Sequence, residues 1–309
     1  MTLNDRAWKL ADELEANAER YRIKVDKVAG TRVIDCGGAV DGSLAAGLML
    51  ARTCLADLAC VSLVPGEFGP AVQVTTDDPV RACLASQYAG WQIKLDNFFA
   101  MGSGPMRAVA AREELFMQIP GKEMAACAVG VLETKRHPTE EVVTHLVSKL
   151  PTSVEKLTLL VAPTSSIAGT VQVVARSVET ALHKLHELKF DVTQVISGYG
   201  TAPLPPVAKD DLHAIGRTND AILYGARVTL WVKCDDELLD VIGPKVPSSA
   251  SADHGVPFGD LLKRVGGEFY RLDPLLFAPA EITFVNLKTG RARTFGRCEP
   301  ELLKKSFFG

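Results

Sequence analysis

Residues 125–133, Ala-Ala-Cys-Ala-Val-Gly-Val-Leu-Glu, and residues 157–162, Leu-Thr-Leu-Leu-Val-Ala, are short apolar runs typical of buried strands. The stretch between them, at about 139–149, predicts a helix. The same alternation continues outward, with further strands expected at 33–36, 60–64, 71–75, 192–196, 221–233 and 281–287. Helices are expected at 4–20, 43–58, 80–88, 167–188 and 209–215, and a Gly/Pro-rich loop is expected at 197–206. Strands that alternate with helices predict an α/β fold, with a mixed α+β arrangement as the alternative.

The length and the charge of the chain exclude several classes of protein. A chain of 309 residues has room for about two domains, which we place at roughly 1–150 and 151–309 of one continuous unit, 1–309; the chain can cross between the two parts. Lys and Arg number 34 and Asp and Glu 37, so the net charge of −3 lacks the basic excess of nucleic-acid-binding and polybasic membrane-surface proteins. No apolar run is long enough to span a bilayer. We therefore expect no nucleic-acid partner and no membrane partner.

The cysteines and the N-terminus indicate a cytoplasmic protein. The seven Cys are widely spaced and include no Cys-x-x-Cys pair, which fits neither a zinc ribbon nor a disulfide framework. Scattered among apolar residues, they are expected to be small buried hydrophobes in a reducing compartment. The first residues, Met-Thr-Leu-Asn-Asp-Arg, open a charged amphipathic stretch rather than the apolar core of a signal peptide.

Two short motifs carry little functional information by themselves. Gly102-Ser103-Gly104-Pro105 has two of the three glycines of a dinucleotide fingerprint, so a turn that begins a helix is the favoured interpretation. Such a helix start can still hold an anion, and Arg107 would add charge. Ser251-Ala252-Asp253-His254 contains the residue types of a catalytic triad, but a polar loop at 246–256 is favoured. The six His are dispersed, and no metal site is expected.

The helix expected at 167–188 separates apolar from polar side chains. At about 100° per residue, one stripe holds Ile167, Val171, Val174, Val178, Leu182 and Leu185. Gln172, Arg176, Glu179 and His183 fall on the opposite side, and Arg176 and Glu179 are spaced i,i+3, so their charges can meet. Periodicity alone favours a solvated face with a surface ion pair. The functional interpretation requires this face to line a cleft between two domains, where Arg176 would hold the Glu179 carboxylate ionised.

A second unusual stretch combines aromatic and amide side chains: Ala85-Ser86-Gln87-Tyr88-Ala89-Gly90-Trp91-Gln92-Ile93-Lys94. Aromatic plates beside amide donors and acceptors suit a flat, polar heterocycle. A helix end with buried aromatics explains the same residues equally well.

Six segments, taken in order, form a pattern more specific than any single motif. They are Val33-Ile34-Asp35-Cys36-Gly37, Ser86-Gln87-Tyr88-Ala89-Gly90-Trp91-Gln92, Phe99-Ala100-Met101-Gly102-Ser103-Gly104-Pro105, Leu160-Val161-Ala162-Pro163-Thr164, Gln172-Val173-Val174-Ala175-Arg176-Ser177-Val178-Glu179-Thr180 and Thr218-Asn219-Asp220-Ala221-Ile222-Leu223-Tyr224-Gly225. In these segments, and from residue 33 to about 295, the chain resembles the methenyltetrahydromethanopterin cyclohydrolase family.

The resemblance implies a hydrolase of one-carbon metabolism that interconverts 5,10-methenyltetrahydromethanopterin plus water with the 5-formyl derivative, without a metal or a redox cofactor. It also implies two α/β parts flanking a large substrate pocket, and a homo-oligomer, typically a homotrimer. The active-site Arg-x-x-Glu pair of the family falls on Arg176 and Glu179. The candidates for lining the pocket are Ser86, Gln87, Tyr88, Trp91 and Lys94.

The chemistry of such a substrate suits the pair. The methenyl compound is an amidinium cation, so its bridging carbon invites attack by water. Glu179 is then expected to accept a proton from that water, while Arg176 orients Glu179 and keeps it ionised, at the cost of making it a weaker base. Gln172 and His183, one helical turn away on either side, are expected to help to hold the water.

Other parts of the substrate are assigned to other residues, and two alternatives stay open. Tyr88 and Trp91 are expected to stack on the pterin, and the Gly102-Ser103-Gly104 turn is expected to contact the anionic tail of the substrate.

The two alternative functions are a cyclohydrolase that acts on a folate and a non-catalytic pterin-binding protein. Because salt-adapted methanogen proteins carry a strong acidic excess, the net charge of −3 favours formaldehyde oxidation to formate in a methylotrophic bacterium over methanogenesis.

Overall fold

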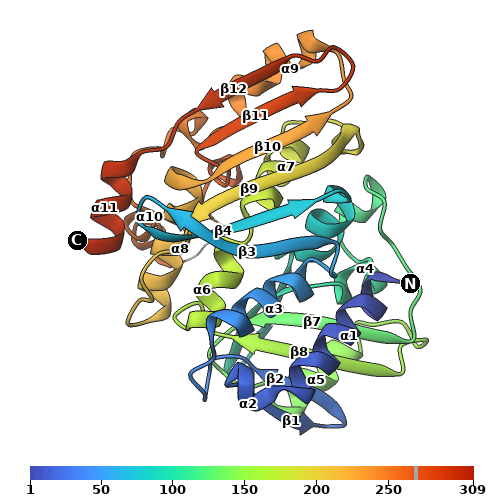
Figure 1. Cartoon of the computed structure of the whole chain (residues 1–309). Helices are drawn as coiled ribbons and strands as arrows, with labels where there is room; N and C mark the ends of the chain where they lie inside the picture. Colours follow the sequence, from blue (N-terminus) through green and yellow to red (C-terminus); the bar gives the residue numbers. More distant parts are fainter. Residues whose placement is uncertain (268–270) are drawn as a thin grey trace. The chain divides into compact units, whose positions relative to one another are not determined.

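The computed structural model describes residues 1–267 and 271–309 and contains two compact units, each built on one six-stranded sheet (Figure 1). Unit 1 comprises Met1–Ala59 and Arg81–Gln172, and unit 2 comprises Cys60–Val80 and Val173–Gly309. Both sheets mix parallel and antiparallel strands, and helices connect or cover them. The α/β prediction is therefore confirmed.

The sheet of unit 1 has the strand order β1-β2-β8-β7-β6-β5. Its three middle strands β2, β8 and β7 are parallel, and β1, β6 and β5 pair antiparallel with their neighbours. The strands are β1 (Lys24–Val28), β2 (Thr31–Asp35), β5 (Trp91–Leu95), β6 (Phe98–Ser103), β7 (Cys127–Glu133) and β8 (Lys156–Ala162). The helices are α1 (Leu3–Ala16), α2 (Ala18–Tyr21), α3 (Leu44–Cys54), the π-helix η1 (Val80–Gln87), α4 (Met106–Ala110), the 3-10 helix η2 (Glu114–Met117), α5 (Glu140–Val147) and α6 (Ile167–Val174).

Strands β7 and β8 lie at the centre of unit 1 because they are apolar on both faces. Successive side chains of a strand point to opposite sides. In β8, Leu160 and Ala162 accordingly join the core cluster that holds α1 and α3, whereas Leu159 and Val161 join the cluster that holds α4 and α5. Figure 1 shows α1 and α3 beside β7 and β8. The two apolar runs are thus the buried strands that the sequence predicts.

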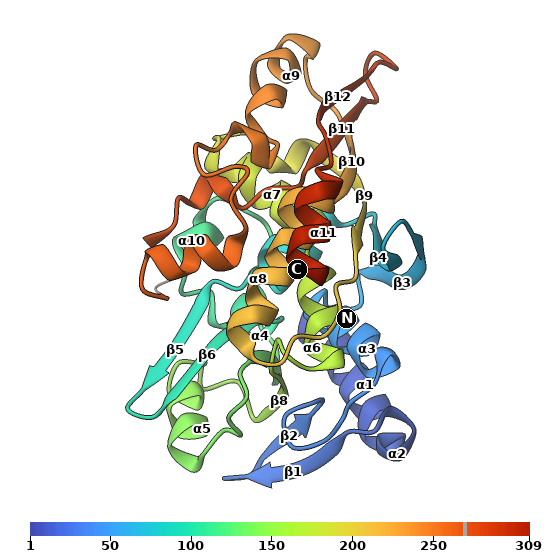
Figure 2. The same cartoon turned by 90° about the vertical axis from the view of Figure 1, so that its left-hand side faces the viewer.

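The sheet of unit 2 has the strand order β12-β11-β10-β9-β4-β3, in which β10 and β11 are parallel. Helices α7 and α8 pack against β9, and α10 and α11 pack against α8 (Figure 2). The strands are β3 (Ala59–Gly66), β4 (Gly69–Thr76), β9 (Val195–Pro203), β10 (Arg227–Val232), β11 (Glu281–Asn286) and β12 (Ala292–Gly296). The described helices are α7 (Ser177–Glu187), η3 (Val192–Gln194), α8 (Asp211–Gly225), α9 (Asp236–Ile242), η4 (Gly243–Lys245), η5 (Ser248–Ala250), α10 (Phe258–Arg264), η7 (Pro274–Leu276) and α11 (Pro300–Phe308).

The chain passes between the units three times, and strand pairing explains where. The β3–β4 hairpin belongs to unit 2 because β4 pairs antiparallel with β9, more than a hundred residues later. Unit 1 continues beyond residue 150 to Gln172 because β8 pairs with both β2 and β7. The division therefore follows long-range pairing and does not fall at 150.

Two local predictions in unit 2 are wrong. Residues 197–206 are expected to form a loop, but most of them belong to β9, which pairs with β4 on one side and β10 on the other. Residues 221–225 are expected to form a strand, but they are the last residues of α8, which begins after the N-cap Asp210. Four of these five residues are buried, so no helical period is visible in the sequence there.

Asp220 of α8 is a buried carboxylate that joins α10 and α11. Its Oδ1 accepts a hydrogen bond from the N–H of Phe258 at 2.8 Å, and its Oδ2 accepts one from the hydroxyl of Ser306 at 2.6 Å. Burial raises the pKa of Asp220 from 3.8 to about 6, although both hydrogen bonds act in the opposite direction. Between these two pKa values the native state binds more protons than the unfolded chain, so the free energy of unfolding falls as pH rises through this window.

We expect Asp220→Asn to stabilise the protein at pH values above the raised pKa by roughly 2–3 kcal/mol, with the difference narrowing as the pH falls toward about 4. Asparagine keeps an acceptor for Phe258 and a partner for Ser306 but carries no charge to bury. Urea unfolding at a series of pH values measures the difference, with Asp235→Asn, whose side chain is 80% exposed, as the control. A difference that does not grow with pH would contradict the assignment.

Candidate functional site

The segment Ser86–Tyr88 lies at the end of the π-helix η1 and is held from two sides. The carbonyl of Ser86 accepts hydrogen bonds from the N–H of Gly104 at 2.9 Å and from Nη1 of Arg107 at 3.2 Å. Ser86 and Gln87 are fully buried, whereas Tyr88 is partly exposed. Since π-helical turns often occur at functional sites, this geometry favours the pocket interpretation of the stretch over a plain helix end.

Three of the predicted site residues meet at Cys54, the last residue of α3. The hydroxyl of Ser86 donates to the carbonyl of Cys54 at 2.6 Å, and Nε2 of Gln172 donates to its Sγ at 3.3 Å. The hydroxyl of Ser103 lies 3.5 Å from the same sulfur. All four residues are buried. The sequence alone predicts that Cys54 is a small buried hydrophobe. Its three partners are distant along the chain, so no local pattern indicates this role.

The Gly102-Ser103-Gly104 turn is built to support the protein interior. Gly102 and Ser103 belong to β6, and the N–H of Gly104 donates a hydrogen bond to the carbonyl of Ser86. Arg107 is 1% exposed, and its guanidinium pairs with Glu113, so it does not present charge to an anion as the sequence suggests. Only five residues form α4, the helix that follows. Arg107 is paired within the protein because a buried guanidinium requires a protein carboxylate and carbonyls as partners.

Trp91 and Lys94 lie on β5, the edge strand of the unit 1 sheet. Trp91 is partly exposed, pairs with Gly102 of β6 and packs against the core cluster beneath it. Lys94 is exposed and pairs with Phe99. Tyr88 and Trp91 are thus both partly exposed; Trp91 pairs with Gly102 of the Gly102–Gly104 turn, and Tyr88 follows Ser86, whose carbonyl is bonded by Gly104, by two residues.

The helix expected at 167–188 is interrupted by a turn at residues 175–176. Helix α6 ends at Val174, and Arg176 is the N-cap residue of α7, with φ −93° and ψ 9°. Glu179 is consequently the third residue of α7, where the positive end of the helix dipole favours a carboxylate. Nη1 of Arg176 lies 3.8 Å from Oε2 of Glu179, so the predicted ion pair is present.

The ion pair is buried and is not the solvated surface pair that periodicity favours. Arg176 is 8% exposed and Glu179 is 4% exposed. Exposed pairs contribute little to stability, whereas burying two charges is unfavourable unless each is compensated. The predicted alternation of buried and solvated faces fails because side chains on both sides of this segment are buried. Burial of a charged pair makes Arg176 and Glu179 the strongest candidates for chemistry in unit 2.

Two glycines of β9 determine how closely the first turn of α7 approaches the sheet. A Cβ at Gly198 would lie 2.7 Å from Cγ1 of Val178, and one at Gly200 would lie 3.0 Å from Cγ2 of Val178 and overlap the Oγ of Ser177. Real side chains do not tolerate such distances, so both positions require glycine. The residues that the sequence suggests form a flexible loop are therefore a strand that positions the Arg176–Glu179 turn.

We expect Gly200→Ala to displace the first turn of α7 and to lower stability by about 1–3 kcal/mol, with a loss of activity. The Ser177 hydroxyl, which is buried and has no hydrogen-bond partner among the described residues, is the atom that the new methyl group overlaps. Gly200→Ala combined with Ser177→Ala should therefore recover part of the loss, as measured by thermal unfolding. An equal loss in the single and double variants would show that this contact does not set the position of α7.

The remaining two residues of the predicted face are separated by the interruption. Gln172 precedes it in α6, so helical geometry no longer places Gln172 one turn from the pair. His183 follows Glu179 by four residues in α7, and its Nε2 lies 3.8 Å from Glu187. Burial lowers the pKa of His183, with Glu187 acting in the opposite direction. His183 is therefore mainly uncharged at neutral pH and able to exchange hydrogen bonds with a water.

The carboxyl ends of the parallel strands in unit 1 carry polar side chains that the sequence analysis did not select. At the end of β2, the Asp35 carboxylate accepts hydrogen bonds from the backbone N–H groups of residues 37–39 at 2.6–2.9 Å. At the end of β7, Glu133 accepts one from the hydroxyl of Thr164, in the loop after β8. Ligands of α/β sheets bind at this edge. Glu133 is the last residue of the first apolar run and Thr164 lies two residues after the second, a signal that the sequence contains.

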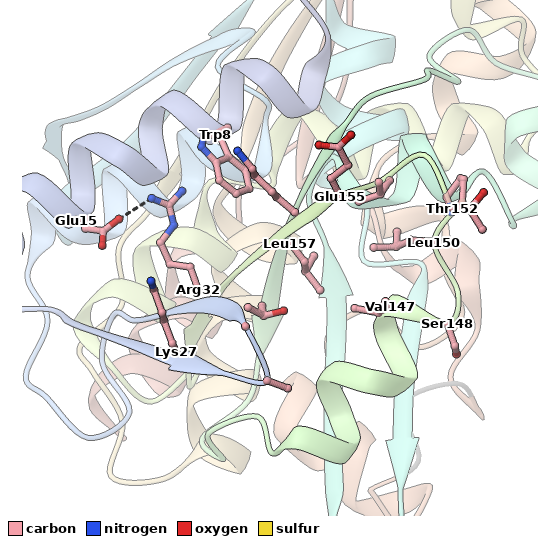
Figure 3. A pocket seen from close by; sticks show the side chains of 16 residues that line it. Trp8, Glu15, Lys27, Arg32, Val147, Ser148, Leu150, Thr152, Glu155 and Leu157 are labelled. Carbon is pink, nitrogen blue, oxygen red and sulfur yellow. Dashed lines mark hydrogen bonds and ion pairs between the residues drawn. The ribbon is translucent and has the colours of Figure 1, made fainter.

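A cavity of about 910 Å³ in unit 1 lies at the opposite edge, beside the first residues of β2 and β8 (Figure 3). Trp8 and Glu15 of α1 line it together with Arg32 of β2, which pairs with Glu15. The residues that line it include none of the predicted site residues. The candidate site is therefore a different part of the molecule.

Within residues 1–267 and 271–309, no group of three or more His, Cys, Asp or Glu side chains is arranged to hold a metal ion. No helix formed by these residues is long and apolar enough to cross a membrane.

His254, one of the triad residue types in the 246–256 loop, lies 3.4 Å from the hydroxyl of Ser248. That hydroxyl itself donates to the carbonyl of Leu223. This serine supports the loop.

Comparison with known proteins identifies relatives over the full length of the chain. The family model described as Cyclohydrolase (MCH) matches residues 2–307. The methenyltetrahydromethanopterin cyclohydrolase of Rhodopirellula baltica is 49% identical over 289 residues, which cover 91% of this chain and 87% of that protein. Proteins of the same name from Methylobacillus flagellatus and Methanococcoides burtonii are 41% and 40% identical, each covering 99% of this chain and 95% and 98% of their own. The chain therefore belongs to the methenyltetrahydromethanopterin cyclohydrolase family.

Proposed function

We propose that this protein hydrolyses the cyclic amidinium of 5,10-methenyltetrahydromethanopterin to 5-formyltetrahydromethanopterin, in a reversible reaction. The observation that carries the proposal is the buried Arg176–Glu179 pair at the start of α7. The chain that contains this pair is similar, over nearly its whole length, to proteins with the name of that enzyme. Charged groups in a buried setting cluster at functional sites, because burial strengthens their action on a bound molecule.

The two members of the pair supply what the reaction needs. Water adds to the bridging carbon of the amidinium and loses one proton to Glu179, whose negative charge also complements the cationic substrate. One C–N bond of the tetrahedral intermediate then breaks as the hydroxyl proton of the intermediate is transferred to the departing nitrogen and the C=O of the formyl group forms. Arg176 holds the carboxylate ionised and fixes its orientation. Because the amidinium carbon is already electrophilic, the addition requires no metal ion or redox cofactor.

Further residues are proposed to hold the substrate and the water. The aromatic side chains of Tyr88 and Trp91 offer flat faces to a pterin, and Ser86 and Gln87 lie beside them in η1. His183 is the candidate for holding the attacking water, since its uncharged ring can both donate and accept a hydrogen bond. We propose Gln172 and the Gly102-Ser103-Gly104 turn as supports of this region, and we keep Lys94, which is exposed on β5, as a candidate for contacting the substrate.

The direct test compares the purified protein on the methenyl derivatives of tetrahydromethanopterin and of tetrahydrofolate, following the decay of the methenyl chromophore. We expect faster turnover of the methanopterin compound. Faster turnover of the folate compound would establish the folate alternative. Tight binding of either compound without decay would establish a non-catalytic pterin-binding protein.

The setting of the reaction follows from the same proposal. We place the enzyme in the cytoplasm as a homotrimer, and the seven free thiols support a reducing compartment. The near-neutral charge supports formaldehyde oxidation to formate as the physiological role. Relatives occur in Methylobacillus and Methylobacterium as well as in Methanococcoides and Methanosarcina.

A further inference from the structure

Arg107 is a charged residue in the interior of unit 1 whose position the reaction alone does not explain. Its side chain is fully buried, in the five-residue helix α4. Burying a guanidinium is unfavourable unless the protein supplies both counter-charge and hydrogen-bond acceptors. The groups that Arg107 contacts therefore indicate which part of the chain its side chain positions.

The contacts of Arg107 converge on the end of η1. Its Nη1 donates to the carbonyls of Leu84 at 3.0 Å and Ser86 at 3.2 Å. These carbonyls belong to the last turn of the π-helix, where backbone acceptors lack helical partners. The guanidinium carbon also lies 5.1 Å from the centre of the Tyr88 ring, within the range of a cation–π contact. One side chain thus fixes both the backbone of Ser86 and the ring of Tyr88.

Glu113 holds the guanidinium in that orientation. Its carboxylate accepts from Nε of Arg107 at 2.8 Å and pairs with Nη2 through its second oxygen, which is the bidentate geometry that fixes a guanidinium most firmly. The chain leaves no free space here, since a Cβ at Gly90 would overlap the Glu113 carboxylate and lie 2.7 Å from Cε1 of Tyr88.

We infer that Arg107, held by Glu113, is a positioning residue that sets the substrate-binding segment Ser86–Tyr88. This inference rests on the proposed function, since it takes that segment to contact the pterin. Arg107 itself does not touch the substrate. It acts through the carbonyl of Ser86 and the ring of Tyr88, so its loss should weaken substrate binding and leave the chemical step at Glu179 largely unchanged.

The kinetic test is Arg107→Lys, which keeps a positive charge but loses the planar, bidentate fork and the stacking on Tyr88. We expect KM for the methenyl substrate to rise about tenfold with kcat within about threefold of the wild type. Glu113→Gln, a milder change that is less prone to misfolding, should raise KM by about threefold. Unchanged KM in both variants, or a loss confined to kcat, would overturn the inference.

Arg32→Lys is the matched control in the same unit. Arg32 has a side chain that is 11% exposed, pairs with Asp12 and Glu15 at 2.6 Å and lies over Trp8, but it has no contact with Ser86–Tyr88. It should leave KM and kcat unchanged. A KM increase equal to that of Arg107→Lys would mean that any buried arginine of unit 1 has this effect, and would overturn the specific role.

A measurement without substrate separates this inference from the proposed function. Amide hydrogen exchange followed by mass spectrometry should show faster exchange at residues 84–90 in Arg107→Lys than in Arg32→Lys, with the rest of unit 1 unchanged. Equal exchange in both variants would overturn the inference even if the enzyme is active. A wild-type protein that does not turn over the methenyl substrate would overturn the proposed function, and the exchange comparison would still decide whether Arg107 holds the segment.

Discussion

Glu179→Gln should abolish nearly all turnover of the methenyl substrate, with a fall in kcat of about 10²–10⁴-fold, while substrate binding is largely retained. Glutamine has the size of glutamate and keeps an oxygen acceptor at the first turn of α7, but it cannot take a proton from water. The decay of the methenyl chromophore measures kcat, and a binding titration with the same compound measures affinity. The loss should therefore appear in the chemical step.

Glu301→Gln is the control for this prediction. Glu301 lies on α11 of the same unit, and its side chain is 85% exposed and pairs with Lys304. Its replacement should change kcat by less than about threefold. A wild-type rate for Glu179→Gln would remove Glu179 as the base, and equal losses in both variants would indicate that loss of any glutamate charge from unit 2 lowers the rate.

Arg176→Ala should slow turnover on the order of 10²–10³-fold and also destabilise the fold, because it removes the positive charge of Arg176 from beside the buried Glu179 carboxylate. The two effects can be separated. Adding Glu179→Gln to Arg176→Ala removes the buried charge, so stability should recover while activity stays low. Thermal unfolding and the chromophore assay measure the two quantities on the same samples.

Arg227→Ala is the control for the alternative that Arg176 forms an ordinary surface pair. Arg227 lies 3.7 Å from Glu281 and its side chain is 61% exposed, so its removal should cost less than about 1 kcal/mol and no activity. If Arg176→Ala changed only the melting temperature, and by no more than Arg227→Ala does, the pair would have no catalytic role.

Local sequence features predicted the parts of this fold that depend on short-range contacts. The apolar runs at 125–133 and 157–162 are strands buried on both faces, and a helix with an N-cap Thr139 lies between them. The Arg176–Glu179 pair is equally local, since residues spaced i,i+3 meet wherever the chain makes a helical turn. These features need only a few neighbouring residues to form.

Local features did not predict the β9 strand or the break between α6 and α7. Glycines such as Gly198 and Gly200 are typical of loops, yet here they belong to a strand. The first turn of α7 packs so closely on this strand that no side chain fits at either position. In the same way, Cys54 is an ordinary apolar position until α3 brings it to Ser86, Ser103 and Gln172. The information for both lies in residues far away along the chain.

The sequence by itself therefore determined the α/β class, the family and the ion pair that we propose to act on an amidinium. Only the tertiary structure decided that this pair is buried, that residues 60–80 join the second unit, and that Arg107 faces Ser86 and Tyr88 instead of solvent. The physical reason is that spacing along the chain sets which neighbours can meet. Burial and partner choice are set by strand pairings and packing contacts between segments that are distant in sequence.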